Sequence, residues 1–200
     1  MFSRFLLVGS LLQKINAVVW MGQMETITES LKLNLGSRDR WIPGFKNVDI
    51  DQHPSVDIVG DVSNLKDIAD GSVDEIYASH ILEHFEYHKT VDVLKEWHRL
   101  LRPSGKLYVA VPDFARAIEV YAHTGLDNWI IRLLCGDQEY KTAYHYALFD
   151  EERLTHQLKK AGFSDSFRVE SFPLENDGDC SNLTSTLDGQ SVSLNIIATK

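Results

Sequence analysis

VDEIYAS, at residues Val73–Ser79, and KLYVAV, at Lys106–Val111, are two short apolar runs separated by a helical pattern. Thr90 is placed to cap that helix, and apolar residues recur through residues 91–101 at helical spacing. Pro103–Gly105 (PSG) then predicts a turn before the second run. A strand, a crossover helix and a second strand are typical of a parallel sheet in an α/β protein.

The same alternation continues on both sides of this unit. Helices are expected at Phe114–His123, capped by Asp113, and at Glu151–Ala161, capped by Asp150 and closed by Gly162. The short interval between Gly36 and Asn47 leaves the first crossover helix one turn long at most. Further strands are expected at Leu31–Leu35, Asn47–Asp51, Val56–Gly60, Ser166–Leu174 and Ser191–Thr199.

The composition describes an ordinary globular chain of 200 residues, with 44% hydrophobic and 24% charged residues. We expect residues 31–200 to form a single domain. A net charge of −9 argues against binding of nucleic acid or of an anionic membrane, because phosphates require a basic face. The two cysteines, Cys135 and Cys180, are interpreted as free thiols in a reducing compartment, which favours the cytoplasm.

Residues 1–30 are interpreted as an N-terminal extension. Phe5–Leu12 (FLLVGSLL) is apolar but far shorter than the roughly 20 residues that a membrane span needs. Apolar positions continue as far as Val19 at helical spacing, which predicts an amphipathic helix lying on the domain or on a partner. An oligomer could form through this helix, and a targeting segment is the alternative.

Polar side chains follow the predicted strands, at the edge where parallel sheets bind their ligands. No G-x-G-x-x-G or Walker sequence is present to bind phosphate. Carboxylates instead suit a cationic ligand with ribose hydroxyls and an adenine amine, and S-adenosylmethionine has these groups. The residues at the strand ends are Gly36, Asp49, Asp51, Asp61, Ser79, His80, Glu83, His84, Pro112 and Asp113.

With these motifs in order, residues 31–113 resemble the class I S-adenosylmethionine-dependent methyltransferases. The resemblance is narrower to a small bacterial-type branch, methyltransferase type 11. It implies a Rossmann-like α/β sandwich with a mostly parallel seven-stranded sheet and an antiparallel last strand. The matching stretches are Leu33–Gly36, Gly44–Ile50, Gly71–Phe85, Leu94–Phe114 and His145–Phe163.

The resemblance also implies roles for the residues at the strand ends. Gly36 would form the tight turn under the methionine part of the cofactor, and Asp49, with Asp51 as its rival, would hold the ribose hydroxyls. Asp61 would accept from the adenine amine, and Ser79 and His80 would line the methyl-transfer end. The chain departs from the family pattern at Arg38, where a glycine is usual, and at Asn34, where an acid is usual.

Histidines offer two further interpretations. His80, His84 and His88 recur every four residues, and such imidazoles can share a metal ion, as in a metallohydrolase. We expect no metal site, because Glu83 would point elsewhere on the helix. His145 lies in Leu126–Phe149, the segment expected to cover the pocket, and would be either a catalytic base or a loop histidine bonded to a carbonyl.

The sequence therefore predicts methyl transfer from S-adenosylmethionine to an oxygen or nitrogen of a small molecule or sugar. His145 or His80 would act as base, and the cover with the loop at Glu175–Gln190 would select the acceptor. The alternative is a methyltransferase-like fold retained as a binding or scaffolding module, with Arg38 occupying the cofactor pocket.

Overall fold

The sheet is the organising element of the structure. The computed structural model describes residues 30–174, 183 and 189–200. Within this part, seven strands form one sheet in the order β3-β2-β1-β4-β5-β7-β6, parallel except that β7 runs antiparallel to both neighbours. The strands are β1 (Lys32–Leu35), β2 (Lys46–Asp49), β3 (Ile58–Val59), β4 (Val73–Ser79), β5 (Leu101–Pro112), β6 (Asp165–Val169) and β7 (Ser193–Thr199). The predicted fold class is confirmed.

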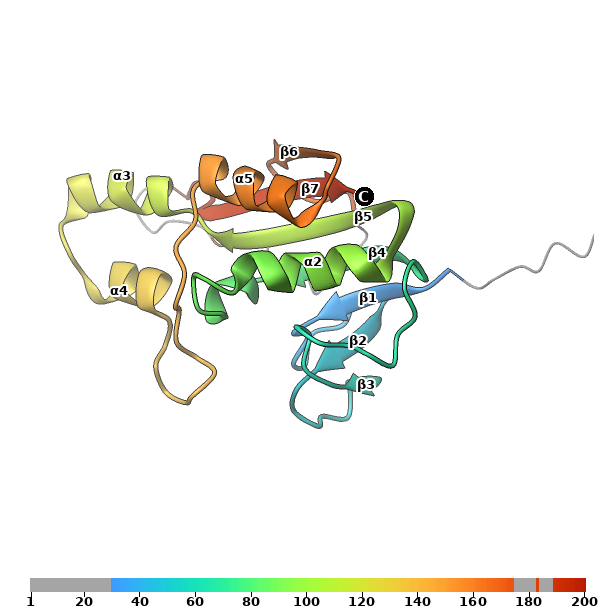
Figure 1. The fold of residues 1–200 in the computed structure, drawn as a ribbon. Coiled ribbons are helices and arrows are strands. Elements are labelled where there is room, and N and C mark those ends of the chain that lie inside the picture. The colour runs from blue at the N-terminus through green and yellow to red at the C-terminus, as the bar shows by residue number, and fades with distance from the viewer. Residues whose placement is uncertain (1–29, 175–182, 184–188) are drawn as a thin grey trace, which may run out of the picture.

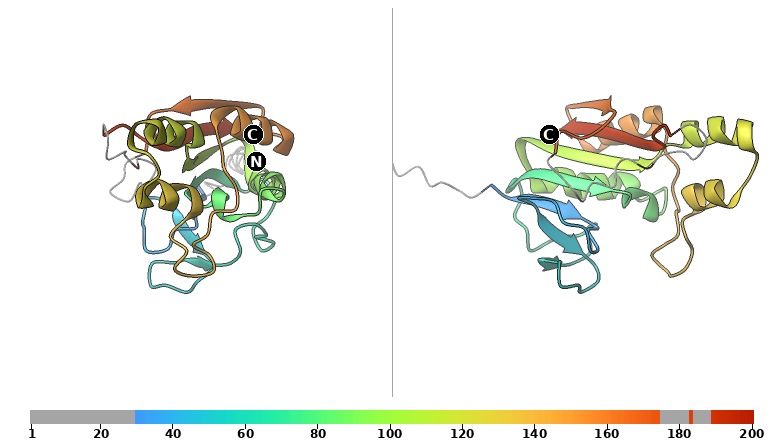
Figure 2. Two further views of the ribbon diagram at one scale, coloured as in Figure 1. Left: turned by 90° about the vertical axis from the view of Figure 1, so that its left-hand side faces the viewer. Right: turned by 180° about the vertical axis from the view of Figure 1, so that it is seen from behind.

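The helices follow the predicted plan with one addition. They are η1 (Leu82–His84, a 3-10 turn), α2 (Thr90–Leu100), α3 (Phe114–Thr124), α4 (Asn128–Cys135) and α5 (Glu151–Ala161). Asp113 and Asp150 cap α3 and α5 as expected, each accepting from the backbone N–H three residues on. The helix α4 was not predicted. Figures 1 and 2 show α3 and α4 beyond the carboxyl ends of β4 and β5.

Some local predictions differ from the structure, and others are not tested by it. Residues 103–105, expected as a turn, form an irregularity inside β5, where the pairing shifts from Val73–Leu101 to Glu75–Lys106. Thr90 begins α2 instead of capping it, because its hydroxyl donates to Tyr87 O and Gln157 Oε1. The helix predicted near the N-terminus and most of the loop at 175–190 lie outside the described residues.

The main core lies between the sheet and the helices α2 and α5, which Figure 1 shows on one face. Side chains alternate along each central strand, so Ile76 and Ala78 of β4 face this core while Tyr77 faces the opposite side. Trp97 of α2 is fully buried, and its indole Nε1–H donates to Val62 O at 3.0 Å. No helix in the described residues is long and apolar enough to cross a membrane.

The opposite face is covered by loops. Residues 36–45 and 50–57 connect β1 to β2 and β2 to β3 without a helix, as the short interval after Gly36 predicted. A smaller apolar cluster covers this face, made of Ile42, Phe45, Tyr77, Tyr108, Ala110, Phe172 and Ile197. The carbonyl groups of these loops must therefore find partners outside a helix.

Two buried asparagines supply those partners. Asn47 is 0% exposed, and its Nδ2 donates to Arg40 O and Ser55 O, both at 2.9 Å. Asn34 on β1 donates to Asn47 Oδ1 at 3.0 Å and to Arg40 O at 3.2 Å. This network ties both loops to the sheet, and it needs an amide donor at Asn34, because an acid at this position could not donate.

Replacing Asn47→Ala should leave Ser55 O without its side-chain donor and remove one of the two hydrogen bonds that Arg40 O and the Asn34 amide each make. We expect a loss of about 2–3 kcal/mol in the free energy of unfolding, measured by urea denaturation followed by circular dichroism. The control is Asn64→Ala, on the exposed loop after β3, which should change stability by less than about 0.5 kcal/mol. Equal effects of the two substitutions would contradict this role.

Candidate functional site

The turn after β1 and the end of β2 meet at the carboxyl edge of the sheet. Asp49, the last residue of β2, accepts the backbone N–H of Arg38 through Oδ2 at 2.7 Å and that of Asp51 through Oδ1 at 3.1 Å. The Gly36 turn and Asp49 are thus brought together as predicted. Asp51 lies beyond the strand with an exposed side chain, because β2 ends two residues earlier than expected.

Gly36 is required by both its backbone conformation and its neighbour. Its φ is +67°, a region that side chains disfavour, and an added Cβ would lie 2.7 Å from Ile81 Cδ1. The next residue, Ser37, is buried, and its Oγ has no hydrogen-bond partner within the described residues. A hydroxyl left unpaired beside this turn is a position where a ligand atom would restore a lost hydrogen bond.

Asp61 and Ser79 extend the edge on either side. The backbone N–H of Gly60 donates to Asp49 O at 2.8 Å, which places Asp61 beside the end of β2. Asp61 is exposed, and its Oδ1 accepts from the N–H of Ser63 at 2.9 Å and from the hydroxyl of Ser63 at 2.7 Å. Ser79 ends β4, paired with Ala110 of β5, and is 7% exposed.

His80 is held by both of its ring nitrogens. Its Nδ1 lies 3.2 Å from Glu83 Oε1 and its Nε2 lies 3.0 Å from Ser193 Oγ. Its φ of +53° breaks the predicted helix at its first residue, so His80, His84 and His88 do not align on one helix face. His80 positions Glu83, and its imidazole is less available as a base than the sequence suggested.

Glu83 is a fully buried carboxylate that the sequence analysis placed after the fourth strand without a role in binding or catalysis. Its side chain is 0% exposed, and Oε2 has no hydrogen-bond partner among the described residues. Burial acts to raise the pKa of the Glu83 carboxyl, but the hydrogen bond from His80 and the nearby imidazoles of His84 and His145 lower it overall. The carboxyl group is therefore ionised in the folded protein.

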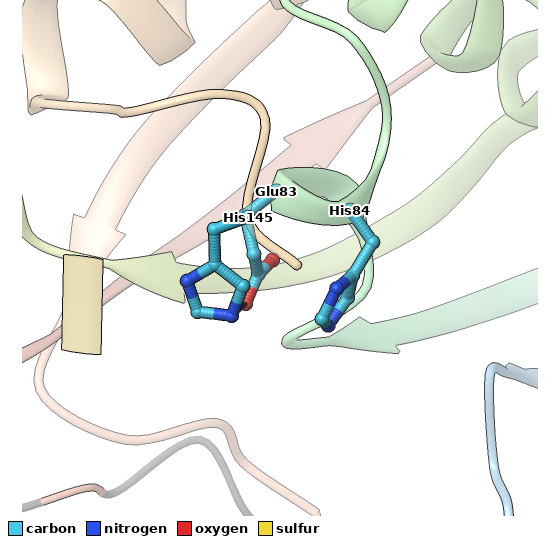
Figure 3. A group of neighbouring side chains, drawn as sticks. All are labelled: Glu83, His84 and His145. Carbon is cyan, nitrogen blue, oxygen red and sulfur yellow. Dashed lines mark ion pairs between the residues drawn. The ribbon is translucent and has the colours of Figure 1, made fainter. Parts of the chain in front are cut away.

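The cover segment is attached to the same residue. The backbone oxygen of Glu83 accepts from the N–H groups of Tyr146 at 2.8 Å and of Ala147 at 3.2 Å. These bonds bring His145 beside Glu83, with its Nε2 4.0 Å from Glu83 Oε1 (Figure 3). Burial is the main cause that lowers the pKa of His145, which is therefore neutral at pH 7.

His84 completes the group that Figure 3 shows around Glu83. Its ring meets that of His145 edge to face, with centroids 4.8 Å apart. The Nδ1 atoms of both rings lie against backbone carbonyls, His84 at 2.9 Å from Tyr144 O and His145 at 3.1 Å from Leu133 O. A carbonyl only accepts, so the Nδ1 of each ring carries a proton, and in the neutral form of either ring Nε2 keeps its lone pair.

The cover also reaches the Gly36 turn. Arg38 Nη1 donates to the Tyr140 hydroxyl at 3.1 Å, and the guanidinium lies 5.6 Å from the centroid of the Tyr140 ring. Both side chains are exposed. Arg38 therefore connects the Gly36 turn with the cover segment.

Comparison with known proteins agrees with this arrangement. Residues 44–109 match a family model described as a methyltransferase domain. This match covers 66 of the 200 residues. No curated protein matches the chain.

Solved structures share the fold of this chain at low sequence identity. A SAM-dependent methyltransferase from Archaeoglobus fulgidus has a TM-score of 0.56 and 15% identity, with 94% of this chain and 93% of that one covered. The 1,6-didemethyltoxoflavin-N1-methyltransferase of Burkholderia thailandensis, with bound 1,6-didemethyltoxoflavin and S-adenosylhomocysteine, has a TM-score of 0.53, 16% identity and coverage of 94% and 83%. A SAM-dependent methyltransferase from Methanosarcina mazei has a TM-score of 0.53, 18% identity and coverage of 87% and 94%.

S-adenosylmethionine is the cofactor of the matched methyltransferases. The edge of the sheet offers hydrogen-bond acceptors for the hydroxyl and amine groups of this cofactor. Asp49 and Asp61 are carboxylates at neighbouring strand ends, and each retains lone pairs for hydroxyl or amine donors after its backbone bonds. The hydroxyl of Ser37, which has no partner within the described residues, lies in the turn that follows β1. The residues predicted to hold ribose and adenine are therefore gathered at one edge.

Two glycines allow a matched test of the turn. Gly36 and Gly44 have positive φ, +67° and +79°, but only Gly36 has a neighbour in the way of a Cβ. Both Gly36→Ala and Gly44→Ala should cost about 1–2 kcal/mol of backbone strain in urea denaturation. Only Gly36→Ala should also displace Ile81 and weaken S-adenosylhomocysteine binding in calorimetry; equal binding by the two variants would contradict a cofactor turn at Gly36.

Proposed function

We propose that this protein transfers a methyl group from S-adenosylmethionine to an oxygen or nitrogen of a small-molecule or sugar acceptor. The main support for the proposal is that hydrogen bonds bring Gly36, Asp49 and Asp61 together at one edge of the sheet, within a class I methyltransferase fold. When bound, S-adenosylmethionine supplies an electrophilic methyl group on a sulfonium leaving group. The protein needs to align the acceptor, exclude water and receive a proton.

The carboxylates of the edge bind and orient the cofactor in this proposal. Asp49 accepts from the two ribose hydroxyls, and its position is fixed by the N–H groups of Arg38 and Asp51. Asp61 accepts from the adenine amine. Asp51 remains the rival for the ribose, although its place in the loop after β2 gives it fewer constraints.

His145 is the better supported base of the two histidines. Its Nδ1–H is committed to Leu133 O, so Nε2 carries a lone pair, whereas His80 Nε2 already lies against Ser193 Oγ. As the acceptor atom forms its bond to the methyl carbon, the carbon–sulfur bond breaks and its electron pair stays on sulfur. The acceptor proton passes to the imidazole.

The acceptor is selected by the cover, residues 126–149. Tyr140, Tyr144 and Tyr146 are 47%, 37% and 49% exposed, and the rings of the last two stack with centroids 6.2 Å apart. Stacked aromatic faces with hydroxyl groups support a sugar or another hydroxyl-rich metabolite. The free thiol of Cys135 and the net charge of −9 support work in the cytoplasm on a partner other than nucleic acid.

Calorimetry with S-adenosylhomocysteine tests the proposal. The wild-type chain should bind, and Asp49→Ala should weaken the affinity by about tenfold or more, because a charged hydrogen bond contributes about 1.5–3 kcal/mol. Asp39→Ala, an exposed acid in the loop between β1 and β2, is the matched control and should bind as the wild type does. Absence of heat at millimolar ligand would overturn the proposal.

The contact between Arg38 and Tyr140 supports a second candidate function. In this alternative the protein is a binding or scaffolding module, and Arg38 blocks the cofactor pocket. As a clamp over bound cofactor, Arg38→Ala should weaken binding of S-adenosylhomocysteine; as a block, the same substitution should strengthen it. Tyr140→Phe, which removes only the hydroxyl, should change affinity in the same direction by a smaller factor. Stronger binding in both variants would favour the module.

A further inference from the structure

Three side chains of the types that can bind metal ions lie close together after β4. Glu83 and His84 lie on η1 and His145 comes from the cover, and one carboxylate oxygen and one nitrogen of each ring all lie within 4.8 Å of one another (Figure 3). Ligands about 2.1 Å from a common ion lie about 3.0–3.4 Å apart. Side-chain rotations that bring the most distant pair about 1.4–1.8 Å closer would therefore complete such a site.

The hydrogen bonds around this group are those of metal-binding histidines. In known metal sites the ring nitrogen that does not bind the ion donates to a carbonyl or carboxylate, which fixes the tautomer. Here Tyr144 O and Leu133 O receive the Nδ1–H groups of His84 and His145. His80, bonded to Glu83 Oε1, holds the carboxylate in the same way.

The buried carboxylate is the independent observation that points to a cation. Glu83 Oε2 is buried with no hydrogen-bond partner in the described part of the chain. The Nε2 of His145, 4.0 Å from Oε1, presents a lone pair to the carboxylate when Nδ1 carries the proton. Burying a carboxylate costs free energy through lost hydration, and its repulsion with the imidazole lone pair adds to that cost. A cation bound between the two groups would remove both contributions.

We propose that Glu83, His84 and His145 bind a divalent transition-metal ion, with His80 positioning the carboxylate. One carboxylate and two imidazoles suit zinc, cobalt, iron or manganese, whereas magnesium and calcium prefer oxygen ligands alone. This set differs from the helical histidine triplet that the sequence offered, and it departs from the expectation of no metal site. Only His84 is common to the triplet and the new set.

The proposed ion has a role that rests on the proposed methyl transfer. Three protein ligands leave coordination positions open, and an acceptor hydroxyl in one of them becomes more acidic. His145 then binds the ion instead of receiving the acceptor proton, which passes to water. The class of acceptor narrows accordingly to a molecule that presents an oxygen to a metal.

A cobalt titration of the untagged full chain tests the site without any activity measurement. Co²⁺ should bind at one ion per chain with the visible absorption bands of a nitrogen and oxygen site. His84→Ala and His145→Ala should each weaken this binding by about tenfold or more. His88→Ala is the matched control, an exposed histidine four residues from His84, and should bind as the wild type does.

Several outcomes would overturn the site. These are absence of the bands, a thiolate charge-transfer band that points to a cysteine, or equal losses in His88→Ala and His84→Ala. Because Glu83→Gln removes a buried charge and risks misfolding, zinc-dependent thermal stabilisation provides the second measurement. Zinc should raise the melting temperature of the wild type and of His88→Ala but not of His145→Ala.

Calorimetry with S-adenosylhomocysteine on the same samples separates this proposal from the proposed function. Metal binding by a chain that does not bind S-adenosylhomocysteine would overturn the methyl transfer and leave the metal site standing. Binding of S-adenosylhomocysteine by a chain that binds neither Co²⁺ nor Zn²⁺ would overturn the metal site alone.

Discussion

The buried carboxylate of Glu83 is the constraint on which the site depends. An ionised carboxylate removed from water loses hydration worth several kcal/mol, so its surroundings must compensate. His80 does so in part, and that bond holds the chain in the left-handed turn that follows β4. The backbone oxygen of the same residue accepts from Tyr146 and Ala147, so the cover is fastened where the charge is buried. The geometry of sheet edge and cover thus follows from one residue.

The loops on the opposite face impose a second constraint on the edge. Without crossover helices after β1 and β2, the turn at Gly36 has no helix N-terminus to fix it. The amides of Asn34 and Asn47 and the carboxylate of Asp49 fix it instead, through bonds to the loop backbone. Arg38 then joins the turn to Tyr140 of the cover. At this edge, side-chain hydrogen bonds therefore fix the turn that a crossover helix would otherwise fix.

Local patterns predicted the elements well where a single physical cause decides them. Val73–Ser79 and Glu151–Ala161 have the bounds that alternation and capping gave, because each is decided by its own residues. The helix α4 was missed because Asp127, its cap, stands in a segment interpreted only as a cover. The gathering of Gly36, Asp49 and Asp61 could be predicted because carboxyl ends of parallel strands meet at one edge.

The pairing of Glu83 with His145 could not be predicted in the same way, since it depends on backbone bonds between distant segments. Helical spacing suggested that Glu83 would point away from the histidines, but His80 breaks the helix and turns the carboxylate toward the cover. Gly136 is the other condition, because a Cβ there would lie 2.0 Å from Ala143 O and prevent the close approach that places His145. A glycine at the end of α4 and a left-handed histidine after β4 together create the cluster. Neither the segment after β4 nor the segment after α4 contains a metal-binding or catalytic sequence motif. The cluster can therefore be recognised only when the two segments are packed against each other in the structure.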